Sequence, residues 1–343
     1  MAVRVAVNGY GTIGKRVADA VARQPDMTLV GVAKTRPSFV ARSAVDRGYR
    51  LFIAGDGEKA VFDAAKLPTA GRIEDLLREV DVVIDAAPDK VGKENAQLYS
   101  KAGIRAIFQG GEKANVAEVS FNALGNYDAA RGKHTIRVVS CNTSGLARAA
   151  AVLTARWEVQ HWEATIVRRA ADPMETKRGP INGILPTFQL PSHHGPDVNT
   201  ILPKLPIATM AVVVPTTLMH VHVNHVRFAP GAGPKDGSEL TETFRRTPRF
   251  HVFAAWEGVE GTPHVMEFAR DRGVGRQDMM ENVLWENGIR VDGRDAYFFQ
   301  AIHQESIVVP ENIDAIRAMF DLAPDGAHSM AITDRALGIP LPG

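Results

Sequence analysis

The sequence predicts an α/β protein whose N-terminal part is a parallel sheet and whose remainder is an α+β domain with a mostly antiparallel sheet. Three observations predict this class. Short apolar segments alternate with helix-like segments over the first 140 residues, which is the pattern of βαβ units. A G-x-G-x-x-G stretch follows the first apolar segment. After about residue 155 the apolar segments become long and rich in β-branched residues.

Apolar periodicity places the elements of the first part. Segments with one apolar face every third or fourth residue favour helices, and these are Ile13–Arg23, Ile73–Val80 and Lys93–Ala102. Short apolar runs favour strands that are buried on both faces. The expected strands are Val3–Val7, Thr28–Ala33, Val82–Ala86, Ile104–Phe108 and Thr135–Val139.

The second part is expected to be a mostly antiparallel sheet. Its expected strands are Trp162–Arg168, Ala208–Val214, Leu218–Phe228 and Phe250–Trp256. Asn287-Gly288, between two short apolar runs, is typical of a β-hairpin turn. Glu311–Leu322 has helical periodicity, and Pro310 suits its first turn. We therefore expect a first domain over 1–140, a second over 141–309, and a C-terminal helix, about 310–343, that packs back on the first.

Length and composition exclude several classes of protein. The 343 residues suit two domains. Lys and Arg number 40 against 39 Asp and Glu, a formal net charge of +1, which speaks against nucleic acid as a partner. The one cysteine, Cys141, excludes an internal disulfide and a cysteine-rich zinc site, and suits a reducing compartment.

The sequence also predicts a cytoplasmic protein with no membrane partner. No stretch reaches the roughly 18 apolar residues of a membrane span. The N-terminal residues run directly into a glycine loop and lack the features of a signal peptide.

The glycine loop predicts a dinucleotide site. It lies after an expected strand and before an expected helix, which is the context that makes the pattern informative. Gly9 permits the tight turn, Gly11 allows close approach of a pyrophosphate, and Gly14 allows the helix to pack on the strand. The helix start favours the anion. An incidental glycine turn is the alternative, and we favour a Rossmann-type dinucleotide-binding domain.

The end of the second expected strand predicts the type of dinucleotide. An Asp or Glu about 20 residues beyond the loop would bind the ribose hydroxyls of NAD. Here the chain has Lys34, Thr35 and Arg36 instead, which could hold the 2′-phosphate of NADP. We predict that either nucleotide is accepted and that NADP is preferred. The alternative is that these are solvated loop charges.

Cys141 follows an expected strand and precedes an expected helix, from about Thr143 to Ala155. A thiol at a helix N-terminus has its thiolate stabilised, so its pKa should fall and it should react near neutral pH. Ser140 and Asn142 make the surroundings polar. A buried, inert cysteine is the alternative.

A cysteine nucleophile needs a base, and a histidine-rich run offers one. On a strand, His220 and His222 share one face and His225 takes the other. The alternatives are a zinc site, which lacks further ligands, and hydrogen-bonded structural histidines. Two clusters also suit anions: Arg168-Arg169 and Ser192-His193-His194-Gly195. The alternative is that each cluster is surface charge or loop.

Taken together, six stretches in this order over nearly the whole chain resemble glyceraldehyde-3-phosphate dehydrogenase of the archaeal type. They are residues 7–17 around the glycine loop, Ser140-Cys141-Asn142-Thr143, Arg168-Arg169-Ala170-Ala171-Asp172-Pro173, Ser192-His193-His194-Gly195-Pro196-Asp197, Pro215-Thr216-Thr217-Leu218-Met219-His220 and His303-Gln304-Glu305-Ser306. Unlike the bacterial and eukaryotic branch, the chain has Asn142 directly after the cysteine.

The resemblance implies a role for each matching residue. Cys141 would be the nucleophile and His220 its base, with Ser140 and Asn142 beside the substrate. The cofactor would lie on Thr12 and Ile13, with Gly110 or Gly111 along its path, Arg169 near it and Gln304 at the nicotinamide amide. Arg168, His193, His194 and Gly195 would lie near the substrate phosphate or the attacking phosphate. The family is a homotetramer that accepts NAD and NADP, and no metal is implied.

The reaction implied is phosphorylating. The Cys141 thiolate would attack glyceraldehyde 3-phosphate to give a thiohemiacetal, and His220 would take the hydroxyl proton as hydride leaves. Inorganic phosphate would then attack the thioester and release 1,3-bisphosphoglycerate. Two other readings stay open. One is a semialdehyde dehydrogenase or acyl-phosphate reductase that uses the same thioester chemistry. The other is a dinucleotide-binding regulatory or RNA-associating protein without turnover.

Overall fold

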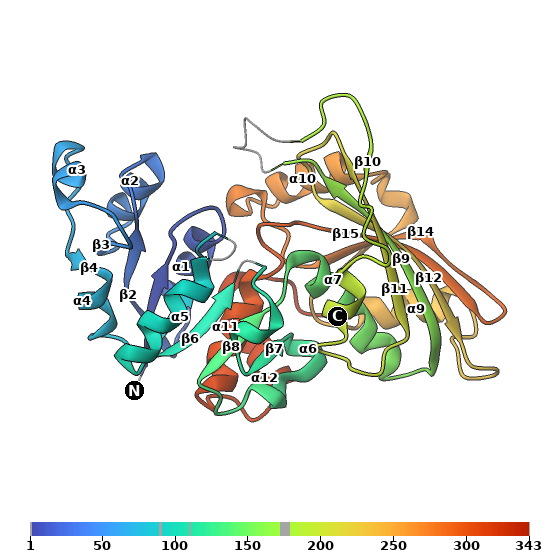
Figure 1. The fold of residues 1–343 in the computed structure, drawn as a ribbon. Helices are drawn as coiled ribbons and strands as arrows, with labels where there is room; N and C mark the ends of the chain where they lie inside the picture. Colours follow the sequence, from blue (N-terminus) through green and yellow to red (C-terminus); the bar gives the residue numbers. More distant parts are fainter. Residues whose placement is uncertain (1, 89–90, 110, 172–178, 343) are drawn as a thin grey trace. The chain divides into compact units, whose positions relative to one another are not determined.

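The computed structural model describes residues 2–88, 91–109, 111–171 and 179–342. The chain divides into two compact units. The first comprises Met1–Ser140 and Val308–Gly338, and the second comprises Cys141–Ile307 and Ile339–Gly343. Each unit is built on one β-sheet with helices packed against it (Figure 1). This confirms the predicted α/β class.

The first unit contains an eight-stranded sheet in the order β4-β3-β2-β1-β5-β6-β8-β7. All of its pairings are parallel. The order runs outwards in both directions from β1 and β5, so a crevice is expected at their carboxyl ends, where such sheets bind ligands. The strands are β1 (Val3–Asn8), β2 (Met27–Lys34), β3 (Leu51–Ile53), β4 (Gly71–Arg72), β5 (Val82–Asp85), β6 (Arg105–Gln109), β7 (Val119–Phe121) and β8 (Thr135–Val138).

Helices cover this sheet because its strands are apolar on both faces. Side chains of α4 (Ile73–Leu77) and α5 (Val91–Ala102) share one buried cluster with strand residues such as Ala6 and Val83. The C-terminal α11 (Val309–Met319) contacts β6, β8 and α1 (Gly14–Ala22). The remaining helices are α2 (Phe39–Asp46), α3 (Lys59–Ala64), η1 (Ala114–Val116), α6 (Ala123–Asn126), η2 (Tyr127–Ala130) and α12 (Gly326–Leu337).

The second unit contains a seven-stranded sheet in the order β10-β11-β9-β12-β15-β14-β13. Only the pairs β9/β11 and β13/β14 are parallel, and the other pairings are antiparallel. The mostly antiparallel sheet predicted for this part is therefore confirmed. Its strands are β9 (Val159–Arg169), β10 (Leu185–Pro186), β11 (Ile207–Val214), β12 (His220–Phe228), β13 (Phe250–Phe253), β14 (Asn282–Asp292) and β15 (Asp295–Ile302).

The longest helix of the second unit, α7 (Cys141–Thr154), lies on β9 and β15. The approach is close at Gly145, where a Cβ would lie 2.8 Å from Ile302 Cγ2 and 3.4 Å from His222 Cε1. A side chain there would force the helix off the sheet. The other helices are α8 (His194–Val198), α9 (Gly237–Arg245), η3 (Ala255–Glu257), α10 (Thr262–Asp271) and η4 (Gly275–Gln277).

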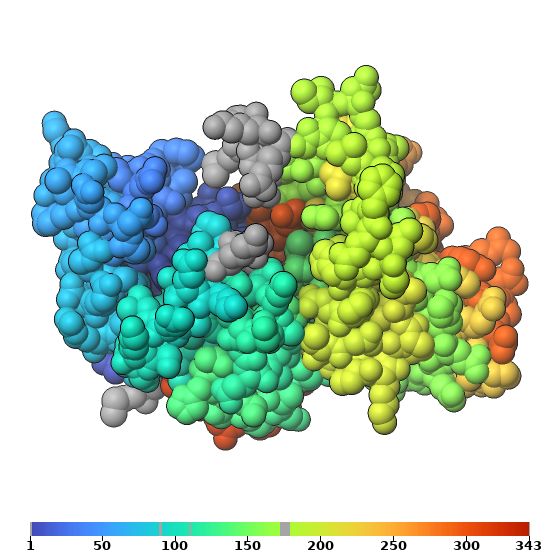
Figure 2. Space-filling view, in the orientation of Figure 1, coloured from blue at the N-terminus to red at the C-terminus, as the bar shows by residue number. Residues whose placement is uncertain are grey.

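Apolar side chains are exposed on two parts of the second unit. Met210, Val223 and Phe299 come from neighbouring strands in one register row, across Thr165, and each is at least 39% exposed. The segment 179–191, in lime green at the surface in Figure 2, exposes Ile181 and Phe188 almost completely. Exposed apolar patches of this kind mark contact surfaces.

The predicted hairpin at Asn287-Gly288 was wrong. These residues lie inside β14, where the register with β15 shifts between Leu284 and Ile289. The turn is made by Gly293-Arg294, because Asp292 still pairs with Asp295. Gly293 takes the left-handed conformation (φ 60°), so a second Gly-containing dipeptide makes the turn. Asn-Gly is accommodated here by a bulge, which also admits glycine.

Two other boundaries differ from the predictions. The strand expected over Phe250–Trp256 ends at Phe253, and Trp256 is exposed in a 3₁₀ turn. The single C-terminal helix expected over about 310–343 is instead α11 and α12, separated by a turn in which Asp321 has a φ of 53°. Among the described residues, no helix has both the length and the apolarity needed to span a bilayer.

Candidate active site

The glycine loop of the first unit is closely packed at Gly9 and Gly14 and open at Gly11. At Gly9 (φ 95°) a Cβ would lie 2.6 Å from the Ala86 backbone, and at Gly14 it would lie 2.1 Å from Gly9 O. At Gly11 it would meet only Gly9 O, at 3.9 Å. The loop therefore fits a ligand that lies over Gly11 at the start of α1.

Backbone donors are available at the same place. Within the described residues, the amides of Thr12 and Ile13 have no hydrogen-bond acceptor, and the first turn of α1 carries no acidic side chain. A helix start with free N–H groups suits a pyrophosphate. Of the other residues predicted along its path, Gly111 is exposed with a φ of 90°, and Gly110 lies outside the described residues.

A buried polar cluster, not predicted from the sequence, links the residue before this loop to the segment that follows β5. Asn8 Nδ2 donates to Tyr99 Oη (2.7 Å), and Tyr99 Oη donates to Asp85 Oδ2 (2.5 Å). Asp85 Oδ1 accepts from the Ala87 amide (3.0 Å). The cluster thus holds the segment against which Gly9 packs. Burial raises the pKa of Asp85, although its hydrogen bonds act in the opposite direction.

Lys34 is the last residue of β2 and is half-buried. Burial lowers the pKa of its amine. The described residues place no carboxylate within ion-pair distance of it, and Thr35 and Arg36 beside it are exposed. The end of this strand therefore offers basic and hydroxyl groups.

The nucleophile candidate, Cys141, is the first residue of α7, two residues before the predicted helix start. The residue as a whole is half-buried. Burial raises the pKa of the thiol to about 11, and the Asn142 backbone N–H and the charges of Arg169 and Arg168 only partly offset this. The lowered pKa expected from the helix start is therefore not found, because desolvation is the largest influence on the thiol.

His220 begins β12 and is buried. Its Nδ1 accepts the Arg169 backbone N–H at 2.9 Å, so the neutral ring carries its proton on Nε2. Burial, followed by the charge of Arg169, lowers the pKa of His220 well below its ordinary value. The charges of Arg168 and Arg169 lower the pKa of both this imidazole and the Cys141 thiol, so both groups lie within electrostatic range of the same arginine pair.

The two arginines have different surroundings. Arg169 is buried in an ion pair with Glu305 (Nη1–Oε1 2.6 Å) and donates to Gln304 Oε1 through Nε. Arg168 has no carboxylate partner among the described residues, and its buried Nε has no hydrogen-bond acceptor there. Arg169 therefore orients Gln304, whereas Arg168 is available to bind an anion.

The neighbouring histidines also differ. Their rings are stacked with centroids 4.0 Å apart, but His193 is exposed and His194 is buried. His194 Nδ1 lies 3.0 Å from Ser192 Oγ, and the Gly195 amide donates to Thr209 Oγ1 at 2.9 Å. Burial, followed by the charges of His193 and Arg168, lowers the pKa of His194 to about 3. His194 is thus neutral, and its position is fixed by Ser192 and by the hydrogen bond from Gly195 to Thr209 on β11.

Sequence reasoning missed the residues that hold these groups in place. Glu305 pairs with Arg169 across 136 positions of the chain, and Asp197 Oδ2 accepts from Thr143 Oγ1 at 2.7 Å. No local pattern could have shown these pairings, because they depend on the packing of distant elements. Within the described part of the chain, no cluster of three or more potential metal ligands occurs.

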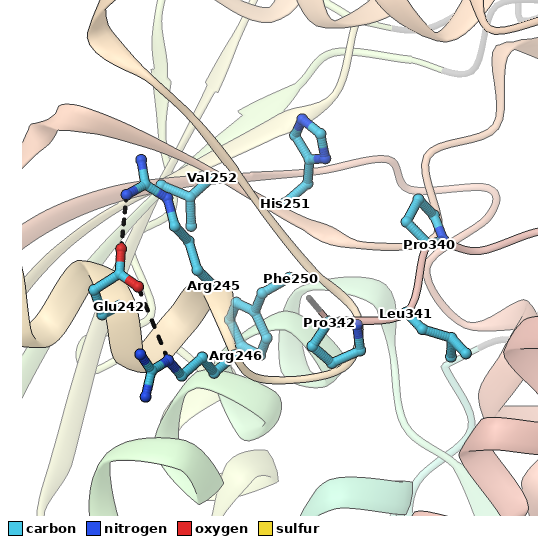
Figure 3. A pocket seen from close by; sticks show the side chains of 9 residues that line it. All are labelled: Glu242, Arg245, Arg246, Phe250, His251, Val252, Pro340, Leu341 and Pro342. Carbon is cyan, nitrogen blue, oxygen red and sulfur yellow. Dashed lines mark hydrogen bonds and ion pairs between the residues drawn. The ribbon is translucent and has the colours of Figure 1, made fainter.

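A groove of about 440 Å³ lies elsewhere on the second unit, between α9, β13 and residues 340–342 (Figure 3). Its two arginines face carboxylates: Arg245 pairs with Glu242 (2.8 Å) and Glu286 (3.3 Å), and Arg246 lies 3.9 Å from Glu242. None of the predicted site residues that the structure describes lines it. We therefore place the candidate active site at Cys141 and not in this groove.

Comparisons with known proteins match both parts of the chain to family models. Residues 140–284 match the family model "Glyceraldehyde 3-phosphate dehydrogenase, C-terminal domain", which spans Cys141, the arginine pair and His220. Residues 3–120 match "Dihydrodipicolinate reductase, N-terminus", which spans the glycine loop.

Similar proteins named glyceraldehyde-3-phosphate dehydrogenase occur in archaea. The chain is 51% identical to that of Archaeoglobus fulgidus, over 99% of this chain and 98% of the relative. It is 50% identical to those of Hyperthermus butylicus (98% and 97% covered) and Halobacterium salinarum (98% and 100% covered). The chain therefore belongs to the glyceraldehyde-3-phosphate dehydrogenase family, in the branch that these archaeal proteins represent.

Proposed function

We propose that this chain oxidises glyceraldehyde 3-phosphate to 1,3-bisphosphoglycerate through a thioester on Cys141, with NAD or NADP as the electron acceptor. One observation carries the proposal. The only cysteine of the chain is the first residue of α7 and lies within electrostatic range of Arg168 and Arg169, in the segment that matches the C-terminal domain of this family.

The nucleophile and its neighbours suit attack on an aldehyde. The Cys141 sulfur forms a bond to the carbonyl carbon, and the carbonyl oxygen gains negative charge that needs donors. With its Nδ1 occupied by the Arg169 N–H, the neutral His220 can donate from Nε2 to this oxygen. Acceptance of the hydroxyl proton at Nε2, the role implied by the resemblance, requires the other tautomer. We therefore assign His220 first as a donor.

The cofactor residues proposed here are Gly9, Gly11, Thr12, Ile13 and Gly14 at the pyrophosphate. A bound nicotinamide supplies hydride acceptance from the substrate carbon. Arg169 keeps the Oε1 of Gln304 occupied, which directs the Gln304 amine toward other acceptors, and the carboxamide oxygen of the nicotinamide is such a group. Gly110 or Gly111 and Arg169 itself complete this proposed set.

The phosphorylating reaction needs anion sites for the substrate phosphate and for inorganic phosphate. Arg168 supports one of them, because its guanidinium has no carboxylate partner in the described structure. His193, exposed above His194, and the Gly195 segment are proposed for the other. Ser140 and Asn142 flank the nucleophile and are proposed to contact the substrate.

A steady-state assay tests the function. Wild-type protein is supplied with glyceraldehyde 3-phosphate and either nucleotide, with and without inorganic phosphate. We expect nucleotide reduction that depends on phosphate. Activity unchanged without phosphate indicates a non-phosphorylating enzyme, and preference for another aldehyde indicates a semialdehyde dehydrogenase. Nucleotide binding without any thiol-dependent reduction indicates a regulator.

We predict that Lys34→Asp raises the KM for NADP about 10–100-fold and that for NAD less than about threefold. The variant removes one charge-assisted contact to the 2′-phosphate and adds a repulsive carboxylate, and such contacts contribute about 1.5–3 kcal/mol. Lys101→Asp, the same charge change on exposed α5, is the control and should leave both constants unchanged. Equal effects of Lys34→Asp on both nucleotides would remove the preference for NADP.

We further propose that the chain assembles as a homotetramer. The exposed row of Met210, Val223 and Phe299 and the exposed Ile181 and Phe188 offer two apolar surfaces on one unit, and tetramers of paired two-fold interfaces bury two such surfaces. Val223→Lys should lower the mass found by sedimentation equilibrium without unfolding the chain. A wild type that sediments as a monomer at micromolar concentration contradicts the assembly.

A further inference from the structure

A buried chain of side chains leads from the α7 backbone to the residue after the nucleophile. Asn282 Nδ2 donates to Gly145 O (2.8 Å) and to Gln300 Oε1 (2.9 Å). Gln300 Nε2 lies 2.9 Å from His222 Nδ1, and His222 Nε2 lies 3.0 Å from Asn142 Oδ1. Asn282, Gln300 and His222 are completely buried, and Asn142 is 4% exposed.

The direction of every hydrogen bond in this series of four side chains follows from the bond that Asn282 makes to Gly145 O. Gly145 O is a carbonyl and can only accept, which fixes the Asn282 amide with Nδ2 as the donor. Gln300 must then accept through Oε1 and donate through Nε2 to His222 Nδ1. The neutral ring therefore carries its proton on Nε2 and donates it to Asn142 Oδ1. A wrong orientation at any member would bury two donors or two acceptors face to face.

His222 is held in this neutral form. Burial lowers the pKa of its imidazole to about 3, so it does not exchange protons near neutral pH. Its ring also packs against α7, with Cε1 3.4 Å from the position of a Cβ on Gly145. His222 therefore differs from His220, which precedes it by two positions on the same face of β12 but whose Nε2 has no such acceptor in the part of the chain that the structure describes.

The hydrogen bond from His222 fixes the orientation of the Asn142 amide. Because Oδ1 is occupied by His222, the Nδ2 amine points away from the network, and it has no acceptor among the described residues. Asn142 lies in the first turn of α7, directly after Cys141. An amide donor beside a nucleophile is suited to the oxygen that becomes negative when the nucleophile attacks a carbonyl.

We propose that His222 is a positioning residue that fixes the Asn142 amide with its Nδ2 donor directed at the carbonyl oxygen of the substrate. The proposal rests on the proposed function, because it assumes an aldehyde bound at Cys141. Gln300 and Asn282 serve the same end by fixing the tautomer of His222. Without these hydrogen-bonded side chains, the Asn142 amide could rotate and present its oxygen, an acceptor, to a developing oxyanion.

Two substitutions separate this role from simple packing. His222→Met fills a similar volume but donates nothing, whereas His222→Gln can accept from Gln300 through Oε1 and donate to Asn142 through Nε2. We expect His222→Met to lower kcat and kcat/KM for glyceraldehyde 3-phosphate together, about 10–100-fold, with KM changed less than about threefold. His222→Gln should restore kcat to within about threefold of the wild type. Equal loss in both variants overturns the proposal.

A double-mutant cycle tests whether His222 acts through Asn142. Asn142→Ala removes the donor, so adding His222→Met should then lower kcat less than about twofold further. Losses that multiply overturn the proposal. If His222→Met does not fold, Gln300→Met tests the preceding link: it should lower kcat at unchanged KM, and an unchanged kcat overturns the proposal.

Wild-type turnover, measured in the same assay, distinguishes the two levels of inference. A wild type that does not oxidise glyceraldehyde 3-phosphate refutes the proposed function itself. An active wild type whose kcat is unaffected by His222→Met refutes only the role of His222. The thermal midpoint of each variant is recorded alongside, because a packing defect would lower stability in His222→Met and His222→Gln without the selective recovery of kcat.

Discussion

Replacing Cys141 by serine is expected to abolish oxidation of glyceraldehyde 3-phosphate, with turnover lowered about 10⁴-fold or more. A serine hydroxyl ionises far less readily than a thiol. His220 is not in the form that would remove its proton, because Nδ1 accepts the Arg169 N–H and the neutral ring therefore carries its own proton on Nε2. The measurement is single-turnover nucleotide reduction with the enzyme in excess. The wild type should show a burst of one reduced nucleotide per site, and Cys141→Ser should show none.

The reactivity of the Cys141 thiol should depend on pH, because it depends on how much of the thiol is ionised. The thiolate is the reactive form, and burial raises the pKa of the Cys141 thiol to about 11. Below that value the thiolate fraction grows about tenfold per pH unit, so alkylation of the unliganded protein by iodoacetamide should accelerate steadily from pH 7 to pH 10. Because Arg168 lowers the pKa of the thiol, Arg168→Gln should slow the reaction at every pH in this range.

Two results would contradict this picture of the nucleophile. Alkylation at a constant rate above pH 7 would mean that the thiol is already ionised there. Phosphate-dependent turnover that persists in Cys141→Ser would refute the covalent route. The substitution of serine for cysteine is nearly isosteric, so an unchanged thermal midpoint serves as the control for folding. Cys141→Ser treated with iodoacetamide should carry no labelled residue, because Cys141 is the one thiol of the chain.

The sequence predicted the fold best where one short pattern decides the structure. Strands that are apolar on both faces, such as Val82–Asp85, can form only inside a sheet covered by helices, and they were found. The predicted hairpin was wrong because two glycine dipeptides compete within ten residues: Asn287-Gly288 lies in a bulge, and Gly293-Arg294 makes the turn. Only pairing with β15 decides between them, and pairing is not a local property.

The same distinction applies to the candidate site. The glycine loop and the position of Cys141 at a helix start are local features, and the sequence showed both. The partners that set the chemistry are distant: Glu305 pairs with Arg169, and His222 bonds Asn142 across 80 positions. The pKa of the thiol follows the same rule, since a helix start can be predicted from sequence, whereas the desolvation that raises the pKa depends on the packing of the whole unit.

His220→Asn is expected to lower kcat about 10²–10⁴-fold, the contribution typical of a positioned acid–base group. Asparagine can still accept the Arg169 N–H through Oδ1, but it has no group where His220 Nε2 stood. The fold of β12 should therefore survive while the donor to the substrate oxygen is lost. His264→Asn is the matched control, because His264 Nδ1 also accepts a backbone N–H (3.0 Å from the Glu260 amide) but the residue is exposed.

A second substitution decides between donation and proton acceptance at this position. His220→Gln places an amine near the position of Nε2, so it can donate but cannot take a proton. Because Nδ1 is engaged and burial with Arg169 keeps the pKa of His220 well below its ordinary value, the ring stays neutral and donation should dominate. His220→Gln should then exceed His220→Asn in kcat by about tenfold or more, and kcat of the wild type should show no inflection near pH 6.5. If the two variants are equally slow, His220 acts by taking the hydroxyl proton, and the ring must change tautomer, or break its bond to Arg169, during each turnover.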